Sequence, residues 1–251
     1  MKFRILLVSV SATLALYCGL NGSSDRPNVL FIAVDDLNSW VTHLGGHPQA
    51  ITPNIDRLAA GGITFENAYC AVPACEPSRA ALMSGQRPWS TGAYLNGDEW
   101  REIFEPGQGL SARFKEAGYH TVGAGKIYHS DERFESEWTE YMDSSAYSNT
   151  GNVPKNQGYH EPLVMDIQDE DISDWHVVDY CIDQMNTNSD KAKFIAAGLH
   201  KPHLPFAVPR KYYEAFPLEE IQLPPYKADD LDDLSDAGRK MALHNTDFEK
   251  F

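Results

Sequence analysis

The run "RPNVLFIAVDD" at residues 26–36 limits the possible fold more than any other segment of this chain. Its middle is apolar without interruption, and it ends in two carboxylates, Asp35 and Asp36. A strand with one solvated face alternates apolar and polar residues, whereas a parallel strand covered on both faces is apolar throughout. The run therefore predicts a buried parallel strand, and such strands occur where helices cover both faces of a sheet.

Other segments continue the alternation of helix and strand patterns. In "TPNIDRLAAGG" (52–62), Thr52 is a suitable N-cap, Pro53 suits the first helical position and Gly61 a helix end. Further patterns are a strand at 63–70, a helix ended by Gly118 and then a strand within 110–129, a helix at 174–185 and a strand at 193–200. The order predicts an α/β fold with a mostly parallel sheet and helices on both faces.

The chain of 251 residues is long enough for one such domain. Residues 130–173 and 207–237 are more polar and have weaker periodicity, so we expect loops and insertions there rather than separate domains. We therefore expect residues 24–251 to belong to one α/β domain. A net charge of −15 argues against a general nucleic-acid-binding protein, which needs a basic surface.

Residues 1–23 have the pattern of a secretory signal peptide. Lys2 and Arg4 precede the apolar run 5–17, which is shorter than the roughly 20 residues needed to cross a bilayer. This predicts an exported protein, periplasmic or secreted, without a stable membrane span. Lipid anchoring at Cys18 is disfavoured because the bulky Tyr17 precedes it.

The number of cysteines leaves at least one thiol without an intrachain partner. Once Cys18 is removed with the signal, Cys70, Cys75 and Cys181 remain, an odd number for an exported chain. Cysteine-only metal binding is disfavoured because the chain has no C-x-x-C pair.

Three polar clusters directly follow strand patterns: Asp35 with Asp36, Lys126 with His129, and His200 to His203. Ligands of open α/β sheets bind beyond the carboxyl ends of the strands, so we expect the three clusters at one edge. The two adjacent carboxylates suit a hard divalent cation, or alternatively Asp36 caps a helix while Asp35 is solvated. Taken alone, Lys126 and His129 are better explained as a surface lysine and a structural histidine.

The segment Cys75-Glu76-Pro77-Ser78-Arg79 is the most specific motif. Four fixed residues in the pattern C-x-P-S-R arise by chance in about one chain of this length in a thousand. The alternative is a buried free cysteine beside a helix start. The motif resembles the signature of the sulfatases, whose cysteine is oxidised by a maturation enzyme to formylglycine, an aldehyde. The resemblance implies that Cys75 is the precursor of this aldehyde and that Arg79 holds it in place.

Two further segments resemble the iduronate-2-sulfatase-like branch of that family. In "GAGKIYH" (123–129) the histidine follows the lysine by three residues, and "LHKPHLPF" (199–206) places two histidines around Lys201 and a proline. The resemblance implies that Lys126 contacts the sulfate and that His203 contacts it and protonates the leaving alcohol. His200 has a structural role in this interpretation, and Lys201 contacts an anionic substrate.

The resemblance also implies the alkaline-phosphatase-like sulfatase fold and a Ca²⁺ or Mg²⁺ ion held by Asp35, Asp36 and the converted Cys75. The hydrated aldehyde has two hydroxyls. One attacks sulfur while the cation, Arg79 and Lys126 stabilise charge; His129 takes a proton from the other, which expels sulfate. A sulfated sugar, for example from a polysaccharide such as a glycosaminoglycan, is the implied substrate.

The chain departs from the family pattern in its length. Family members are considerably longer, and residues 207–251 contain no Asp-His or Asp-Asn pair before a glycine to complete the metal site. We therefore expect a truncated chain without the C-terminal part, which exposes apolar surface that sheet partners would cover. Two alternatives remain: a phosphate or phosphonate ester hydrolase of the same superfamily, and an inactive truncated fragment.

Overall fold

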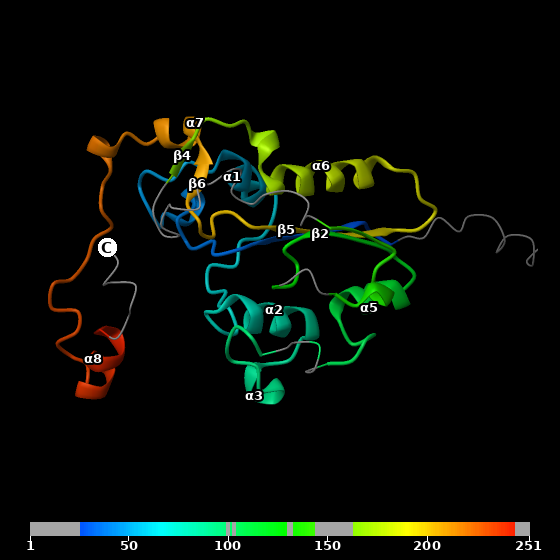
Figure 1. The fold of residues 1–251 in the computed structure, drawn as a ribbon, viewed down its shortest axis with the longest axis horizontal. Helices are drawn as coiled ribbons and strands as arrows, with labels where there is room; N and C mark the ends of the chain where they lie inside the picture. Colours follow the sequence, from blue (N-terminus) through cyan, green and yellow to red (C-terminus); the bar gives the residue numbers. More distant parts are fainter. Residues whose placement is uncertain (1–25, 99–100, 102–103, 130–132, 144–162, 244–251) are drawn as a thin grey trace, which may run out of the picture. The chain divides into compact units, whose positions relative to one another are not determined.

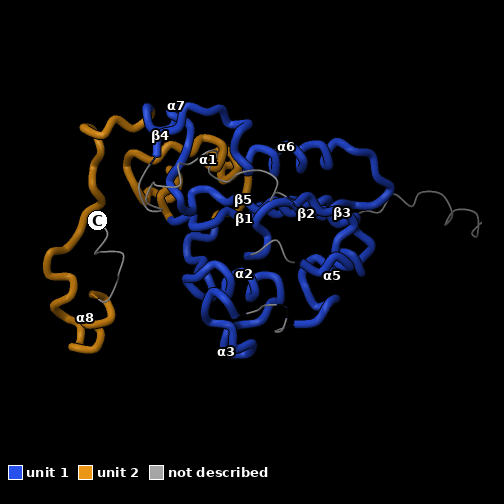
Figure 2. Tube along the Cα trace, viewed as in Figure 1, with its two compact units in different colours: residues 1–38, 65–214 blue, residues 39–64, 215–251 orange. Residues whose placement is uncertain are grey.

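The computed structural model describes residues 26–98, 101, 104–129, 133–143 and 163–243. The predicted signal peptide and the chain end after 243 lie outside these residues. The chain divides into two compact units, residues 1–38 with 65–214 and residues 39–64 with 215–251 (Figure 2). None of the described helices combines the length and the apolar character that crossing a bilayer requires.

A parallel sheet forms the centre of the first unit. Its described strands follow the order β1 (Val29–Val34), β5 (Lys193–Leu199), β2 (His120–Gly125) and β3 (Glu140–Met142), and all neighbours are parallel. Three of these strands lie where the sequence predicts strands. The fourth, β3, lies within residues 130–173, where loops and insertions were expected and no strand was predicted. Two short parallel strands, β4 (Leu163–Met165) and β6 (Ala207–Pro209), form a second sheet.

Helices cover both faces of the main sheet, as the sequence predicts. Helix α6 (Ser173–Asn186) lies on one face, and α2 (Cys75–Ser84) and α5 (Leu110–Glu116) lie on the other (Figure 1). Strand β5 alternates between the two cores: Phe194 packs with residues of α2 and α5, and Ile195 packs against Val177 of α6. The ring of Phe194 stacks on Phe114 of α5 at 4.0 Å between centroids.

The remaining elements are short. They are the helices α1 (Pro53–Ala60), α3 (Pro88–Thr91), α7 (Arg210–Glu214) and α8 (Asp236–Leu243), and the 3₁₀ turns η1 (Thr42–Leu44), η2 (Glu135–Glu137), η3 (Asp169–Asp171) and η4 (Leu218–Glu220). Helix α1 begins at Pro53 and ends before Gly61, as predicted. In the second unit, the Gln49 side chain donates to Glu220 O and accepts from Gln222 N–H, which joins its two chain segments.

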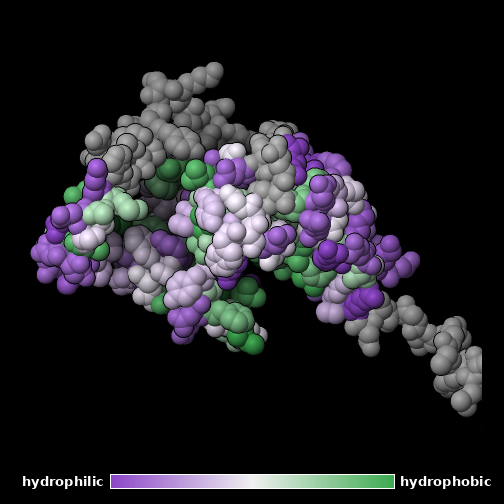
Figure 3. Space-filling view, turned by 90° about the horizontal axis from the view of Figure 1, so that it is seen from below, coloured by the Kyte–Doolittle hydropathy of each residue, from purple (hydrophilic) through white to green (hydrophobic). Residues whose placement is uncertain are grey.

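The prediction that β1 is buried on both faces is wrong for the described residues. Its Leu30 and Ile32 are 46% and 49% exposed, because β1 lies at the edge of the main sheet and α6 packs over β2 and β5. Other apolar side chains of this unit are also exposed, among them Leu82 and Trp89. The surface in Figure 3 accordingly shows hydrophobic areas between hydrophilic ones, which agrees with the expected exposed apolar surface.

The strand predicted at 63–70 is also absent: these residues form turns and irregular chain. The segment has the composition of a strand, and Ile63, Phe65 and Tyr69 are exposed. A strand forms only when a neighbouring strand satisfies its backbone hydrogen bonds, and no described strand pairs with this segment.

Two glycines let β2 and β5 meet closely at their carboxyl ends. Gly125 pairs with Gly198 and has φ +69°, and a Cβ at Gly125 would lie 2.2 Å from Gly198 O. That carbonyl accepts the N–H of Lys126 at 2.9 Å. The glycine pair thus determines where the chain leaves β2 toward the polar clusters.

Replacing Gly125 with alanine should therefore lower the free energy of unfolding by about 2–5 kcal/mol, because a left-handed backbone and a backbone clash combine. Gly85 is the matched control: its φ is +70°, but no atom lies within 4 Å of an added Cβ. Gly85→Ala should cost only about 1–2 kcal/mol. Equilibrium urea unfolding measures both, and equal losses would contradict the role of the close approach.

Candidate active site

The three polar clusters meet at one edge of the main sheet, as the sequence predicts. Asp35 N–H donates to Leu199 O at 3.1 Å, so the chain segments that follow β1 and β5 remain aligned beyond the strands. The Lys126 ammonium donates to Asp35 Oδ2, and His203 Nε2 lies 3.8 Å from Asp36 Oδ2. Residues distant in sequence are therefore gathered because the parallel strands end together.

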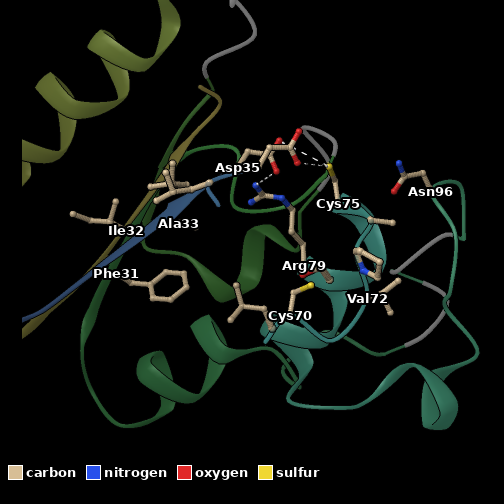
Figure 4. A pocket seen from close by; sticks show the side chains of 16 residues that line it. Phe31, Ile32, Ala33, Asp35, Cys70, Val72, Cys75, Arg79 and Asn96 are labelled. Atoms are coloured by element: carbon tan, nitrogen blue, oxygen red, sulfur yellow. Dashed lines mark hydrogen bonds and ion pairs between the residues drawn. The ribbon is translucent and has the colours of Figure 1, made fainter. Parts of the chain in front are cut away.

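Cys75 is the first residue of α2 and projects into this edge (Figure 4). Its Sγ lies 4.0 Å from Asp35 Oδ2 and 3.9 Å from Asp36 Oδ1. It lines a pocket of about 590 Å³ with the end of β1, the chain before α2 and Asn96. This volume suits a small ligand or one sugar residue.

The thiol of Cys75 is a poor nucleophile in its unmodified form. Burial raises its pKa above the ordinary value, and the nearby Asp35 carboxylate raises it further. The thiolate is the reactive form of cysteine, so raising the pKa makes the thiol less reactive at neutral pH. Cys70, Cys75 and Cys181 are all free, which agrees with the odd cysteine count.

Arg79 lies one helical turn after Cys75, on the same side of α2. Its Nη2 donates to Asp35 Oδ1 at 2.8 Å, and its Nη1 donates to Lys126 O. Both Arg79 and Asp35 are buried, at 7% and 5% exposure. The guanidinium therefore connects the start of α2 with the ends of β1 and β2.

Asp35 is neutralised by cations of the chain itself. Burial works to raise its pKa, but the hydrogen bonds and charges of Lys126 and Arg79 outweigh burial and hold the pKa below its ordinary value. Asp36 adopts φ +54°, a strained conformation for a non-glycine residue, and directs its carboxylate toward Cys75 and His203. This placement differs from the helix cap considered as an alternative.

The donor set fits a hard divalent cation. Ligand atoms of Asp35, Cys75 and His203 lie within 4.8 Å of one another, and Asp36 Oδ1 also faces the thiol. Ca²⁺ and Mg²⁺ prefer oxygen, which both carboxylates supply and a thiol does not. An oxygen in place of Cys75 Sγ would complete an oxygen-rich set.

The loop after β5 carries the two histidines of the "HKPH" segment. His203 Nδ1 lies 2.7 Å from Leu204 O and must donate, because a carbonyl only accepts. His200 Nε2 approaches the same carbonyl at 3.0 Å, which agrees with its expected structural role. Burial lowers the pKa of His200.

Asp174 was not predicted as a site residue, although its side chain holds this loop in place through hydrogen bonds. Its two carboxylate oxygens accept the N–H groups of His200 and Lys201, each at 2.8 Å. The only sequence signal is an acidic residue in the first turn of the predicted helix at 174–185, and its partners are 26 and 27 residues away.

Lys201 lies outside the cluster around Cys75. Its Nζ donates to Pro205 O at 2.6 Å, and burial lowers its pKa. It lines a different cavity of about 430 Å³ together with Trp175 and Tyr212. Its predicted contact with an anionic substrate stays a prediction.

His129 lies beside a second residue that sequence reasoning missed, Glu76. Their Nδ1 and Oε2 atoms are 3.4 Å apart. Burial lowers the pKa of His129, and the charge of Lys126 lowers it further, whereas Glu76 acts in the opposite direction. The signal was available in the sequence, because Glu76 occupies the variable position of the C-x-P-S-R motif.

Comparisons with known proteins identify relatives of this chain. The sulfatase family profile matches residues 27–235. A sulfatase of Formosa agariphila is 35% identical over 239 residues, which cover 86% of this chain and 47% of that protein. Iduronate 2-sulfatase of Homo sapiens is 32% identical over 240 residues, covering 88% of this chain and 43% of that protein.

Phosphonate monoester hydrolase of Agrobacterium radiobacter shares the fold, with a TM-score of 0.62 at 18% identity, over 79% of this chain and 45% of that one. The chain spans less than half the length of each of these three proteins. The profile match covers the main sheet and the residues gathered at its edge, and the similarity extends to iduronate 2-sulfatase. The chain therefore belongs to the sulfatase family.

Proposed function

We propose that this protein is a sulfuric ester hydrolase that removes sulfate from a sulfated sugar, for example one in a polysaccharide such as a glycosaminoglycan. The observation that carries the proposal is the position of Cys75, whose Sγ lies within 4.0 Å of both Asp35 and Asp36. The relative named iduronate 2-sulfatase supports a sulfated sugar as the substrate class.

Cys75 is the precursor of formylglycine in this proposal, and a maturation enzyme that recognises the segment is the required partner. The complete C-x-P-S-R motif at residues 75–79 supports conversion. When present, the hydrated aldehyde supplies one hydroxyl to attack sulfur and a second from which a proton can be removed to release sulfate.

Asp35, Asp36 and the oxygen that replaces Cys75 Sγ would hold Ca²⁺ or Mg²⁺. A divalent cation at this position supplies positive charge to the sulfate oxygens. Lys126 and Arg79 add charge from the protein: Arg79 also holds Asp35 in place, and Lys126 is the direct sulfate contact.

His203 and His129 are the proposed general acid and general base. The Nδ1–H of His203 is bound to Leu204 O, so donation of a proton from Nε2 to the departing alcohol requires the doubly protonated imidazolium form, whose Nε2 lies 3.8 Å from Asp36 Oδ2. His129 accepts a proton from the second hydroxyl, and burial, which lowers its pKa, favours the neutral form that a base needs. Lys201 is assigned to an anionic part of the substrate, outside the cluster.

Export to the periplasm or the cell exterior follows from the signal-like residues 1–23, which lie outside the described residues. We propose no nucleic-acid partner, because the net charge of −15 opposes one.

A second candidate function is phosphate or phosphonate ester hydrolysis, which the fold similarity to phosphonate monoester hydrolase supports. Such reactions commonly use two divalent cations and a Ser or Thr nucleophile, whereas the chain has the complete Cys-type motif. The motif therefore favours sulfate esters.

The deciding experiment compares turnover of a sulfate ester and the matching phosphate ester by protein coexpressed with a formylglycine-generating enzyme. We expect kcat/KM for the sulfate ester to be higher by about 10²-fold or more. A chelator should abolish turnover and Ca²⁺ should restore it. Preferred phosphate turnover would support the second candidate, and no turnover by fully converted protein would favour an inactive chain.

A further inference from the structure

Glu76 is a buried carboxylate that the proposed reaction does not use. It is the second residue of α2, it is only 6% exposed, and it stands between Cys75 and Pro77. Burial of a carboxylate is unfavourable unless donors compensate it. The partners of Glu76 therefore indicate why this position holds an acid.

Those partners come from two other segments. Glu76 Oε2 accepts the N–H of Gly97 at 2.5 Å and lies 3.4 Å from His129 Nδ1. The backbone N–H of Glu76 donates to Asn96 Oδ1 at 3.0 Å, and Asn96 lines the pocket of Cys75. Glu76 thus contacts both the segment after β2 and the turn that contributes Asn96.

We propose that Glu76 is a positioning residue that holds His129 as the Nδ1–H tautomer. Glu76 Oε2 accepts the N–H of Gly97, so this oxygen acts as an acceptor, and the ring nitrogen that faces it carries the proton. The other neutral tautomer would place two lone pairs against each other across 3.4 Å. A carboxylate oxygen that faces Nδ1 at this ion-pair distance favours the tautomer with the proton on Nδ1 and the lone pair on Nε2.

The consequence for catalysis rests on the proposed function. A histidine that takes a proton from the second hydroxyl needs a defined lone pair and a fixed ring, and Glu76 supplies both. Because the variable motif position carries this acid, one short segment provides the future nucleophile and the residue that orients its proton acceptor.

The direct test is the tautomer of His129 in the full chain, measured by long-range ¹H–¹⁵N correlation with ¹⁵N-labelled histidine. Loss of a signal in His129→Gln assigns the ring. Wild type should show the Nδ1–H form, and a predominant Nε2–H form in wild type would overturn the proposal without any further variant.

Two substitutions separate the acceptor from the packing. Glu76→Leu has a similar volume but no acceptor, and should shift His129 toward the Nε2–H form. Glu76→Gln keeps an amide oxygen and should retain the Nδ1–H form. His203 is the internal control, because its Nδ1 faces Leu204 O and not Glu76. An unchanged His129 tautomer in Glu76→Leu would contradict the proposal.

Kinetics then test the catalytic consequence on protein whose conversion is verified by a mass about 18 Da lower. Glu76→Leu should lower kcat by about 10–100-fold with little change in KM, and Glu76→Gln should recover most of the loss. If wild type turns over substrate and the His129 tautomer is unchanged in Glu76→Leu, the positioning role of Glu76 is contradicted and the proposed function remains. If converted wild type shows the Nδ1–H tautomer of His129 but no turnover, the proposed function is contradicted and the positioning role remains.

Discussion

Replacing Cys75 with alanine should abolish sulfate-ester turnover, with kcat falling by a factor on the order of 10⁴ or more, as is typical when a covalent nucleophile is removed. The variant keeps the carboxylates, Arg79 and Lys126, but it has no sulfur to convert. Intact mass should be about 18 Da below the sequence mass in wild type, and this loss should be absent in Cys75→Ala. Initial rates on protein coexpressed with the maturation enzyme measure the effect.

Cys181→Ala is the matched control. Cys181 is also a free thiol, but it belongs to α6 and is buried against the other face of the sheet. Its removal should lower stability slightly and leave turnover unchanged. If the Cys181 variant were inactive and the Cys75 variant active, the assignment of the nucleophile would be wrong.

Cys75→Ser distinguishes attack from release. Serine has one hydroxyl and no second one from which a proton can be removed, so sulfate transferred to it should remain. We expect a mass gain of about 80 Da on incubation with substrate and no repeated turnover. Sustained turnover by this variant would show that the second hydroxyl is not needed.

Replacing Arg79 with methionine should lower the free energy of unfolding by about 3–5 kcal/mol, because it removes one partner of a buried ion pair. Arg79 and Asp35 are 7% and 5% exposed, so water compensates little for the loss. Lys126 remains beside the Asp35 carboxylate and limits the effect. Equilibrium urea unfolding, with the protein free of added metal, measures the change.

Arg113→Met provides the comparison at an exposed pair. Arg113 lies 2.9 Å from Glu116, but their side chains are 61% and 60% exposed, so this pair contributes little. A double variant, Arg79→Met with Asp35→Asn, should recover part of the loss because no buried charge is left unpaired. Equal losses for Arg79→Met and Arg113→Met would contradict the buried-pair argument.

The secondary structure was predictable where local sequence carries the physical cause. Helix α1 follows from Pro53 and Gly61, and β5 follows from a continuous apolar run that is buried on both faces. The strand predicted at 63–70 does not form, and β3 was not predicted, because a strand depends on a partner distant in sequence. Composition alone does not reveal that partner.

The gathering of the polar clusters at one sheet edge was predictable, but the pairings of their side chains were not. Parallel strands bring their carboxyl ends together, so Asp35, Lys126 and His203 could be placed at one edge from strand order. The sequence did not show that Arg79 and Lys126 both neutralise Asp35, because the pairing of charges depends on the direction in which each side chain points. Lys201, adjacent to the loop histidines in sequence, instead donates to Pro205 O.

The sequence by itself determined the family, the parallel sheet and the motif that begins at Cys75, because a short motif and continuous apolar runs are local properties. Only the tertiary structure decided that Glu76 faces His129 and that Asp174 holds the loop after β5. The first contact joins residues 53 positions apart, and the second joins residues 26 and 27 positions apart. They form because carboxylates that lose water on folding require donors that the fold brings from elsewhere in the chain.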